Sequence, residues 1–455
     1  MTPDLLWALG MGLLGAVVFA AIGLVSGTDE TSTLAPVTLL VVLLGVPPAG
    51  VLTFFIAGAV SKHMTHAIPT TLLGIPGDTT AVPLLDDATA LRRLGAPHIA
   101  LRKALAGGLV AAFIAVPVAV GVASLLAPLA GPIKTVAPFV FGAAAIFVGY
   151  FSPGRWASIA AIVPFALLVT GLNTVATDQL DKSLSISFFL GIAIGPLVVD
   201  LLIASSRNGR RTLERTGPRP FWLAPDSGAG RRWIPNPLRI LDRGQAAATA
   251  AAAGVTSTTF MLSPVAATVL AGEITGSRIR HPYRRLTTLM AVKNGTTEST
   301  YLAETLIPLV AFGLPLSPVA AGPAAALFNA PPVYTVKGPD GGVHNLHTLL
   351  SSWQFLVFSL IGVAIAGLVV YPFAMRYARA ASGWVARRIS HEALIGAFVA
   401  LIAVVAWYEG GPLALAVSLT VGAVGGLANR MLGMTSGVQF MAYYVAVLLV
   451  PLVLG

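Results

Sequence analysis

Cysteine is absent from the 455-residue sequence, and charged residues make up only 10% of it. The missing cysteine excludes disulfides, thiol nucleophiles and cysteine-ligated metal or iron–sulfur sites. Ordinary soluble domains carry about 25% charged residues, so the low charge, with 56% apolar side chains and a mean hydropathy of +0.84, excludes that class. Because each crossing needs roughly 20 apolar residues, the chain accommodates about ten to twelve crossings or half-crossings and no large soluble domain.

The net charge of +10 is unevenly distributed along the chain. Most of the 28 lysines and arginines lie in four segments, residues 92–103, 207–243, 278–285 and 376–388. Basic clusters between apolar runs are typical of cytoplasmic loops. We therefore interpret them as topology signals with some contact to lipid headgroups, and we predict no nucleic-acid partner.

Residues 70–83, TTLLGIPGDTTAVP, interrupt an apolar region with glycine, proline, aspartate and threonine. Pro76 lacks a backbone donor and Gly77 permits a positive φ, so a helix entering from Leu73 should stop here. In a bilayer such a break survives only where protein or a water-filled cavity satisfies the freed backbone groups. The segment is therefore a candidate binding site, with a plain proline kink as the alternative.

A second polar interruption, GTDETST at residues 27–33, separates a first span at residues 5–25 from a second that we place at about residues 34–60. Acidic and hydroxyl side chains between two apolar helices fit either an exposed loop or another unwound site. We expect the unwound site because the second half of the chain contains a similar segment.

The second half repeats both interruptions in the same order. Residues 254–265, GVTSTTFMLSPV, resemble residues 27–37, GTDETSTLAPV, and a GLP sequence at residues 313–315 follows an apolar approach, as GIP does at residues 74–76. Broken helices at corresponding positions of two halves indicate a transporter binding site. Chance similarity between threonine-rich segments is the alternative.

Lys62 and Arg92 flank the first break, and we expect both at the cytoplasmic side. The segment between them would then enter and return as a re-entrant hairpin, with residues 77–80 near the middle of the bilayer. His63 and His66 precede it on one predicted helix face. Metal sites normally need a third ligand, so we expect these histidines at the membrane interface.

The predicted fold is an all-α polytopic membrane protein with two pseudo-repeats, each with broken helices and a re-entrant hairpin, as in elevator-type transporters. Residues 1–204 form the first transmembrane repeat and residues 205–244 a basic cytoplasmic linker. Residues 245–347 form the second broken-helix and hairpin region, and residues 348–455 are transmembrane scaffold helices.

The breaks also suggest a chemistry. A helix that begins after Gly77 would expose unpaired N–H groups and the positive end of its dipole to an anionic substrate. Carbonyls at interrupted helix ends, with nearby carboxylates, suit Na⁺ or a proton. Carboxylates at membrane depth are costly, so each should pair with a charge, bind a cation or carry a proton. We rank Asp29, Asp78 and Glu298 first for such a role, because we expect each of them inside a hydroxyl-rich break. An enzyme is not predicted, since no cluster of acid, base or nucleophile has convincing spacing.

The order of these features resembles the large membrane subunit, TctA, of the tripartite tricarboxylate transporters. The matching segments of the first half are residues 26–33, 71–77 (TLLGIPG) and 85–95 (LDDATALRRLG). Those of the second half are residues 253–259, Glu273, residues 294–299, and LIPL at 306–309 leading to GLPL at 313–316. The resemblance covers nearly the whole chain. It departs from the family pattern at Ser26-Gly27, at residues 295–299 (GTTES), at Ala303-Glu304, and at Leu316, where the family has a second glycine. The second half thus departs more than the first.

The resemblance implies a secondary active transporter of the bacterial cytoplasmic (inner) membrane that moves an organic anion, a carboxylate such as citrate. Coupling to Na⁺ or H⁺ is implied, with no other cofactor. It also implies a small membrane subunit and a periplasmic or lipid-anchored binding protein as partners, and a homodimer is compatible with it. The alternative is a flippase or exporter of an anionic lipid or polyprenyl phosphate, which would use the same broken helices.

The predicted site residues fall into two groups, and neither contains a catalytic or metal-binding residue. The predicted substrate-binding residues are Gly74, Pro76, Gly77, Asp78, Thr79, Thr80, Thr296, Thr297, Gly313, Pro315 and Ser317. The predicted ion-coupling residues are Thr28, Asp29, Glu30, Thr31, Ser32, Thr256, Ser257, Asn294, Glu298 and Glu304.

Overall fold

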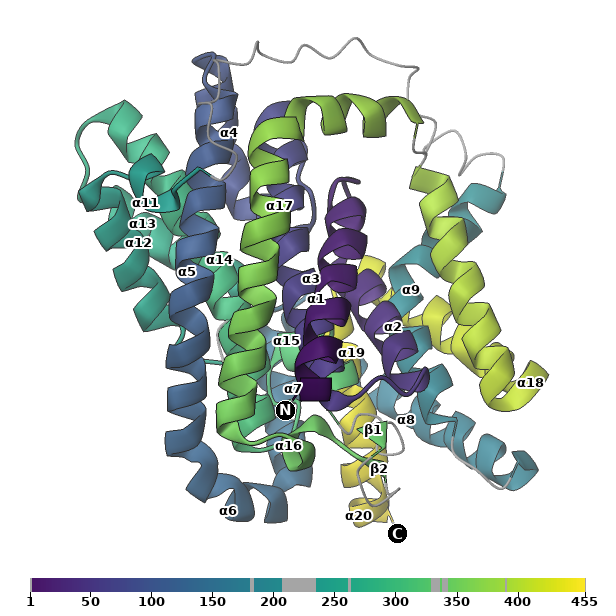
Figure 1. The fold of residues 1–455 in the computed structure, drawn as a ribbon. Helices are drawn as coiled ribbons and strands as arrows, with labels where there is room; N and C mark the ends of the chain where they lie inside the picture. The colour runs from purple at the N-terminus through teal and green to yellow at the C-terminus, as the bar shows by residue number, and fades with distance from the viewer. Residues whose placement is uncertain are drawn as a thin grey trace.

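The computed structural model describes residues 2–180, 184–206, 235–260, 263–328, 336–337, 343–388 and 391–454, and this part of the chain is almost entirely helical (Figure 1). Seven of its helices are long and apolar enough to cross a membrane: Pro3–Gly23, Pro97–Ile133, Trp156–Leu180, Ile186–Ile203, Ser352–Val385, Gly396–Leu432 and Ser436–Val453. The protein is therefore an integral, multi-pass membrane protein, and the predicted all-α class is confirmed.

The first half contains twelve described helical segments. They are α1 (Thr2–Gly23), α2 (Glu30–Leu43), α3 (Pro48–Ile68), the π-helical turn η1 (Pro69–Leu73), the 3₁₀ helix η2 (Thr79–Leu84), α4 (Leu85–Arg93), α5 (Pro97–Leu126), α6 (Ala130–Thr135), α7 (Ala137–Phe151), α8 (Trp156–Leu180) and α9 (Ser185–Ser205), with a short 3₁₀ turn, η3 (Ala127–Leu129), between α5 and α6. The span expected at about residues 34–60 is wrong, because residues 44–47 separate α2 from α3.

The second half begins with α11 (Pro237–Ile240), α12 (Arg243–Thr256), α13 (Pro264–Gly276) and α14 (Pro282–Ala311). It continues with α15 (Pro318–Ala321), η4 (Ala325–Leu327), a two-residue antiparallel pairing of β1 (Val336–Lys337) with β2 (Val343–His344), and α16 (Leu346–Leu349). The last elements are α17 (Ser352–Arg388), α18 (His391–Leu432), α19 (Ser436–Tyr444), η5 (Val445–Leu449) and α20 (Val450–Leu454).

Two pairs of helices at the centre of the molecule pack closely together through glycine residues. A Cβ on Gly15 of α1 would lie 2.3 Å from the carbonyl oxygen of Phe54 on α3, and one on Gly107 of α5 would lie 2.2 Å from that of Ala291 on α14. Small residues allow membrane helices to approach this closely. Helices α1 and α3 from the first half are thus held tightly together, as are α5 and α14 from different halves.

Other helices flank this centre. In Figure 1, α12 and α13 lie on one side beside α14, whereas α9 and α18 lie on the other. Of the predicted linker, residues 207–234 lie outside the described residues. The rest includes α11, which packs on α5, where the Lys103 Nζ donates hydrogen bonds to the Ile240 carbonyl and to Gln245 at the start of α12.

Candidate functional site

The predicted break at Pro76-Gly77 is confirmed, and the chain turns back there. The π-helical turn after α3 ends at Gly74, whose φ of +70° is left-handed. The chain then runs back along α3, because the Gly77 N–H donates to Thr70 Oγ1 at 3.1 Å and a Cβ on Gly77 would lie 2.5 Å from His66 Cβ. Helices η2 and α4 return to the level of Leu73, whose carbonyl accepts a hydrogen bond from the Arg92 guanidinium.

The two interruptions of the first half pair with each other. Ser26 Oγ donates to the Pro76 carbonyl at 2.7 Å, and the Gly27 N–H donates to the Gly77 carbonyl at 2.7 Å. Carbonyls freed by a broken helix must find donors inside a membrane protein. The interruption after α1 therefore supplies hydrogen-bond donors to the freed carbonyls of the interruption at Pro76-Gly77. This pairing places Glu30 beside the tip of the hairpin.

The carboxylate of Asp78, at the tip of the hairpin, is surrounded by hydrogen-bond donors. Its Oδ2 lies 2.9 Å from Lys62 Nζ and 2.8 Å from His66 Nδ1. Its Oδ1 accepts hydrogen bonds from the Thr80 hydroxyl at 2.7 Å and from the N–H groups of Thr80 and Ala81 at 3.0 and 3.2 Å. The side chain of Asp78 is fully buried, so these contacts replace the water that a carboxylate otherwise requires.

His63, one residue after Lys62, joins the two halves of the chain. Its Nε2 lies 2.6 Å from Glu30 Oε1, and its Nδ1 lies 2.9 Å from Glu298 Oε2 on α14. The ring of Tyr301, one turn further along α14, meets the His63 ring edge-on at a centroid distance of 4.6 Å. One imidazole thus bridges α2 and α14.

We refer to Glu30, Lys62, His63, His66, Asp78 and Glu298 as the buried charge cluster. Each of its members is at most 5% exposed. Three carboxylates and three basic side chains meet away from solvent, where an uncompensated charge costs several kcal/mol. Ionisable groups of this kind inside a membrane protein indicate a functional site.

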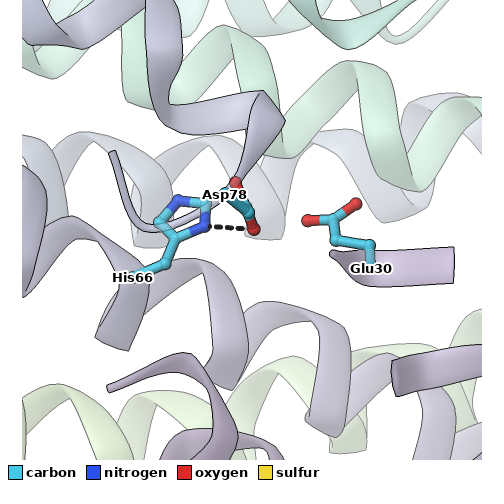
Figure 2. Close-up of side chains that lie close together, drawn as sticks. All are labelled: Glu30, His66 and Asp78. Carbon is cyan, nitrogen blue, oxygen red and sulfur yellow. Dashed lines mark hydrogen bonds and ion pairs between the residues drawn. The ribbon is translucent and has the colours of Figure 1, made fainter. Parts of the chain in front are cut away.

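Three members of the cluster lie close enough together to be considered as ligands of a metal ion. Glu30, His66 and Asp78 each offer an atom, and these atoms lie within 4.8 Å of one another. Figure 2 shows Glu30 pointing toward Asp78 from the start of α2, while His66 is hydrogen-bonded to Asp78. However, the Lys62 ammonium already lies on Asp78 Oδ2 and on the Thr28 carbonyl, 2.9 Å from each. Because this tethered cation already lies on the same Asp78 oxygen that contacts His66, we assign no metal ion to these three residues.

The second predicted break forms a separate group beside α2. Gly313 ends the approach from α14 with a φ of +65°, and Ser317 Oγ accepts from the Ala320 N–H and donates to the Glu304 carbonyl at 2.6 Å. Glu304 Oε2 accepts from the Val319 N–H at 3.1 Å. A Cβ on Gly322, just after α15, would lie 3.2 Å from Thr31 Oγ1, so this group borders the start of α2.

The other predicted residues lie outside the cluster, and their proposed roles stay predictions. Thr79 is exposed. The Asp29 carboxylate caps α2 at the Ser32 N–H, and Ser32 Oγ donates to the Ala193 carbonyl of α9. Four more of the predicted side chains bond within or between the helices around α14: Thr256 with Ser299, Ser257 with Ala253, Thr297 with Thr268, and Asn294 with Ala104. The buried Thr296 hydroxyl has no hydrogen-bond partner among the described residues.

Four expectations about this region are wrong. His63 and His66 are buried inside the protein, not at a membrane interface, and Lys62 is fully buried beside the hairpin tip instead of flanking it. Glu298 lies in the middle of the continuous helix α14, not in a break. The N–H groups of Thr80 and Ala81 are not open to an anion, because Asp78 already caps them.

Sequence reasoning missed Lys62, His63, His66 and Tyr301 as members of the site. A signal was present: the three basic side chains fall within α3, in an otherwise apolar run, at spacings that share a helix face. Charged residues inside such a run are rare unless they pair with other groups in the protein.

A cavity of about 750 Å³ lies apart from the cluster, between α12 and α13. Its walls include the apolar side chains Ala252, Val255 and Leu270, and Arg278 and Arg284 also line it. None of the buried charge cluster lines this cavity.

Comparison with known proteins gives one family. The family model described as "Tripartite tricarboxylate transporter TctA family" matches residues 9–436. No curated protein and no solved structure matches. The match begins within α1 and ends at the start of α19, so it includes every member of the buried charge cluster.

Proposed function

Because the chain belongs to the TctA family of tripartite tricarboxylate transporters, we propose that it carries an organic anion of the carboxylate class across the cytoplasmic membrane by secondary active transport. The observation that carries this proposal is the buried charge cluster, which links the re-entrant tip at Asp78 to Glu298 in the second half. A cation, Na⁺ or H⁺, couples to the anion at this cluster.

The arrangement of the breaks supports an alternating-access mechanism. In the first half α1, the short helix α2 and α3 lead to the left-handed Gly74, and in the second half α12, α13 and α14 lead to the left-handed Gly313. We propose that these two series are pseudo-repeats and that their hairpins move against α17, α18 and α19 as an elevator. Substrate binds between the hairpins, at the residues predicted from the sequence around Asp78 and Ser317.

The family description also supports partners for this chain. A tripartite transporter has three components, and we propose that a small membrane subunit and a binding protein that delivers the anion are the other two. We further propose a homodimer and an inner-membrane location. A transporter needs no catalytic residue, and we assign none.

We expect Asp78→Asn to reduce citrate counterflow in proteoliposomes to background. The amide keeps an acceptor for Lys62 or for the Thr80 N–H, but the charge that holds Lys62 in place is lost, which also costs stability, so counterflow is compared at equal amounts of folded protein. The matched control is Glu273→Gln, which neutralises an exposed carboxylate on α13 and should leave counterflow unchanged. Wild-type counterflow in Asp78→Asn would contradict the proposal.

A flippase or exporter of an anionic lipid or polyprenyl phosphate is the second candidate. The observation that favours it is the apolar cavity between α12 and α13, with Arg278 and Arg284 in its lining, which suits a chain with an anionic headgroup. Thermal stabilisation by a short-chain polyprenyl phosphate, abolished by Arg278→Gln with Arg284→Gln, would support it. Stabilisation by citrate that these changes leave intact would favour the carboxylate transporter.

A further inference from the structure

The triad of Glu30, His63 and Glu298 has an unusual hydrogen-bonding requirement. Both ring nitrogens of His63 face a carboxylate oxygen, at 2.6 and 2.9 Å. A neutral imidazole has one N–H and one lone pair, so it can donate to only one of the two carboxylates. At the other contact, lone pairs would face each other across a hydrogen-bond distance, which is repulsive.

Each of the two contacts therefore needs a proton between nitrogen and oxygen. Two arrangements supply both protons: an imidazolium between two carboxylates, or a neutral imidazole with one carboxylic acid and one carboxylate. Both arrangements hold the same two protons and give the triad a net charge of −1. Removal of one proton gives a net charge of −2 and leaves one contact without its hydrogen bond.

The fixed cation nearest the triad, Lys62, is already paired with another carboxylate. Lys62 and Asp78 form an ion pair with each other, and His66 Nδ1 is engaged by the same Asp78 oxygen. The titratable and charged groups near the triad are Asp29 at the start of α2, Lys62 and His66 on α3, Asp78 at the hairpin tip, and Tyr301 and Glu304 on α14. Among these, only Lys62 is a fixed cation.

We propose that Glu30, His63 and Glu298 bind one exchangeable proton and that this proton is the coupling ion, an inference that rests on the proposed function. With the proton bound, His63 on α3 is hydrogen-bonded to both Glu30 on α2 and Glu298 on α14. When the proton leaves to water, one of these two hydrogen bonds is lost. Because α2 and α14 belong to different halves, occupancy of this site controls whether His63 links α2 to α14.

The charge of the triad sets the direction of coupling. An anionic substrate is repelled more strongly by a triad of charge −2 than by one of charge −1, and this repulsion is large where water is scarce. The substrate therefore binds better to the protonated protein, and by linkage the proton binds better to the substrate-loaded protein. Proton and anion move together, which is symport.

The transport test compares the wild type with His63→Gln, whose side-chain amide neither gains nor loses a proton between about pH 5 and 9. For each coupled proton, one unit of pH gradient multiplies the citrate accumulation ratio about tenfold. A plot of the logarithm of accumulation against the pH gradient should therefore lose one unit of slope in His63→Gln, because this slope reports the number of coupled protons and not the rate at which the variant works. An unchanged slope would overturn the proposal.

A second measurement needs no substrate, so it separates failure of this inference from failure of the proposed function. Infrared difference spectra of the purified protein, recorded across pH, should show one titrating carboxyl–imidazole signal in the wild type and in Glu273→Gln. The signal should be absent from His63→Gln and from Glu298→Gln. If His63→Gln and Glu298→Gln both retain the signal, the proposed proton site is wrong. If they lose it but the wild type shows no citrate counterflow, the proton site stands and carboxylate transport is refuted.

Discussion

Replacement of Lys62 by methionine should destabilise the folded protein by roughly 3–5 kcal/mol, the usual cost of removing one partner from a buried ion pair. The Lys62 side chain is fully buried and its ammonium lies 2.9 Å from both Asp78 Oδ2 and the Thr28 carbonyl. Without it, the Asp78 carboxylate stays buried with no fixed cation. The midpoint of unfolding in detergent, measured by temperature or by SDS titration, reports the loss.

Two further variants make this expectation specific. Adding Asp78→Asn to Lys62→Met removes the unpaired charge and should restore much of the lost stability, but not citrate counterflow. Lys293→Met is the matched control, because Lys293 also pairs with a carboxylate, Asp87, at 2.6 Å. The side chains of that pair are 14% and 12% exposed, so water can partly replace the lost partner and the cost should be smaller than that of Lys62→Met. Equal losses in Lys62→Met and Lys293→Met would contradict the account.

Gly77→Ala should abolish citrate counterflow by displacing the hairpin tip. A Cβ at this position would lie 2.5 Å from the Cβ and carbonyl oxygen of His66 and 2.8 Å from its Cα. Two of these are backbone atoms of a packed helix, which cannot move aside as a flexible side chain can. The extended segment would have to shift, taking Asp78 away from Lys62, and overpacking of this kind typically costs about 1–3 kcal/mol.

The control for this change is Gly121→Ala in α5, where an added Cβ would meet no atom within 4 Å. Alanine is favoured over glycine in a helix by roughly 0.5–1 kcal/mol, so this variant should be at least as stable as the wild type and fully active in counterflow. Wild-type counterflow in Gly77→Ala would show that the close approach to His66 is not required.

The sequence predicted the membrane class and the first break because those features are local. Proline lacks a backbone donor and glycine tolerates a left-handed φ wherever they occur, so Pro76 and Gly77 indicate a break without tertiary information, although the residue that takes the left-handed φ is Gly74 and not Gly77. The role of His63 depends on a partner 235 residues away, Glu298. Nothing in the local pattern of α3 specifies that contact, and Lys62 therefore resembled an ordinary cytoplasmic topology signal.

The hydroxyl-rich residues around Glu298 show that a local pattern can also predict a break where the helix is continuous. Their composition predicts a break, yet α14 is continuous. Thr297 Oγ1 donates back to the Lys293 carbonyl, and Ser299 Oγ donates to the Thr296 carbonyl. Hydroxyl side chains can satisfy themselves on the preceding turn of their own helix, so threonine content without proline or a left-handed glycine does not predict an unwound segment.

The most direct test of carboxylate transport through the buried charge cluster is thermal stabilisation of the purified protein by citrate. A ligand that binds only the folded state raises its stability, by about 2.7 kcal/mol at 100 times the dissociation constant. We predict that citrate raises the unfolding temperature of the wild type and of Glu273→Gln but not that of Asp78→Asn. Equal stabilisation of Asp78→Asn, or stabilisation by a polyprenyl phosphate but by no carboxylate, would contradict the account.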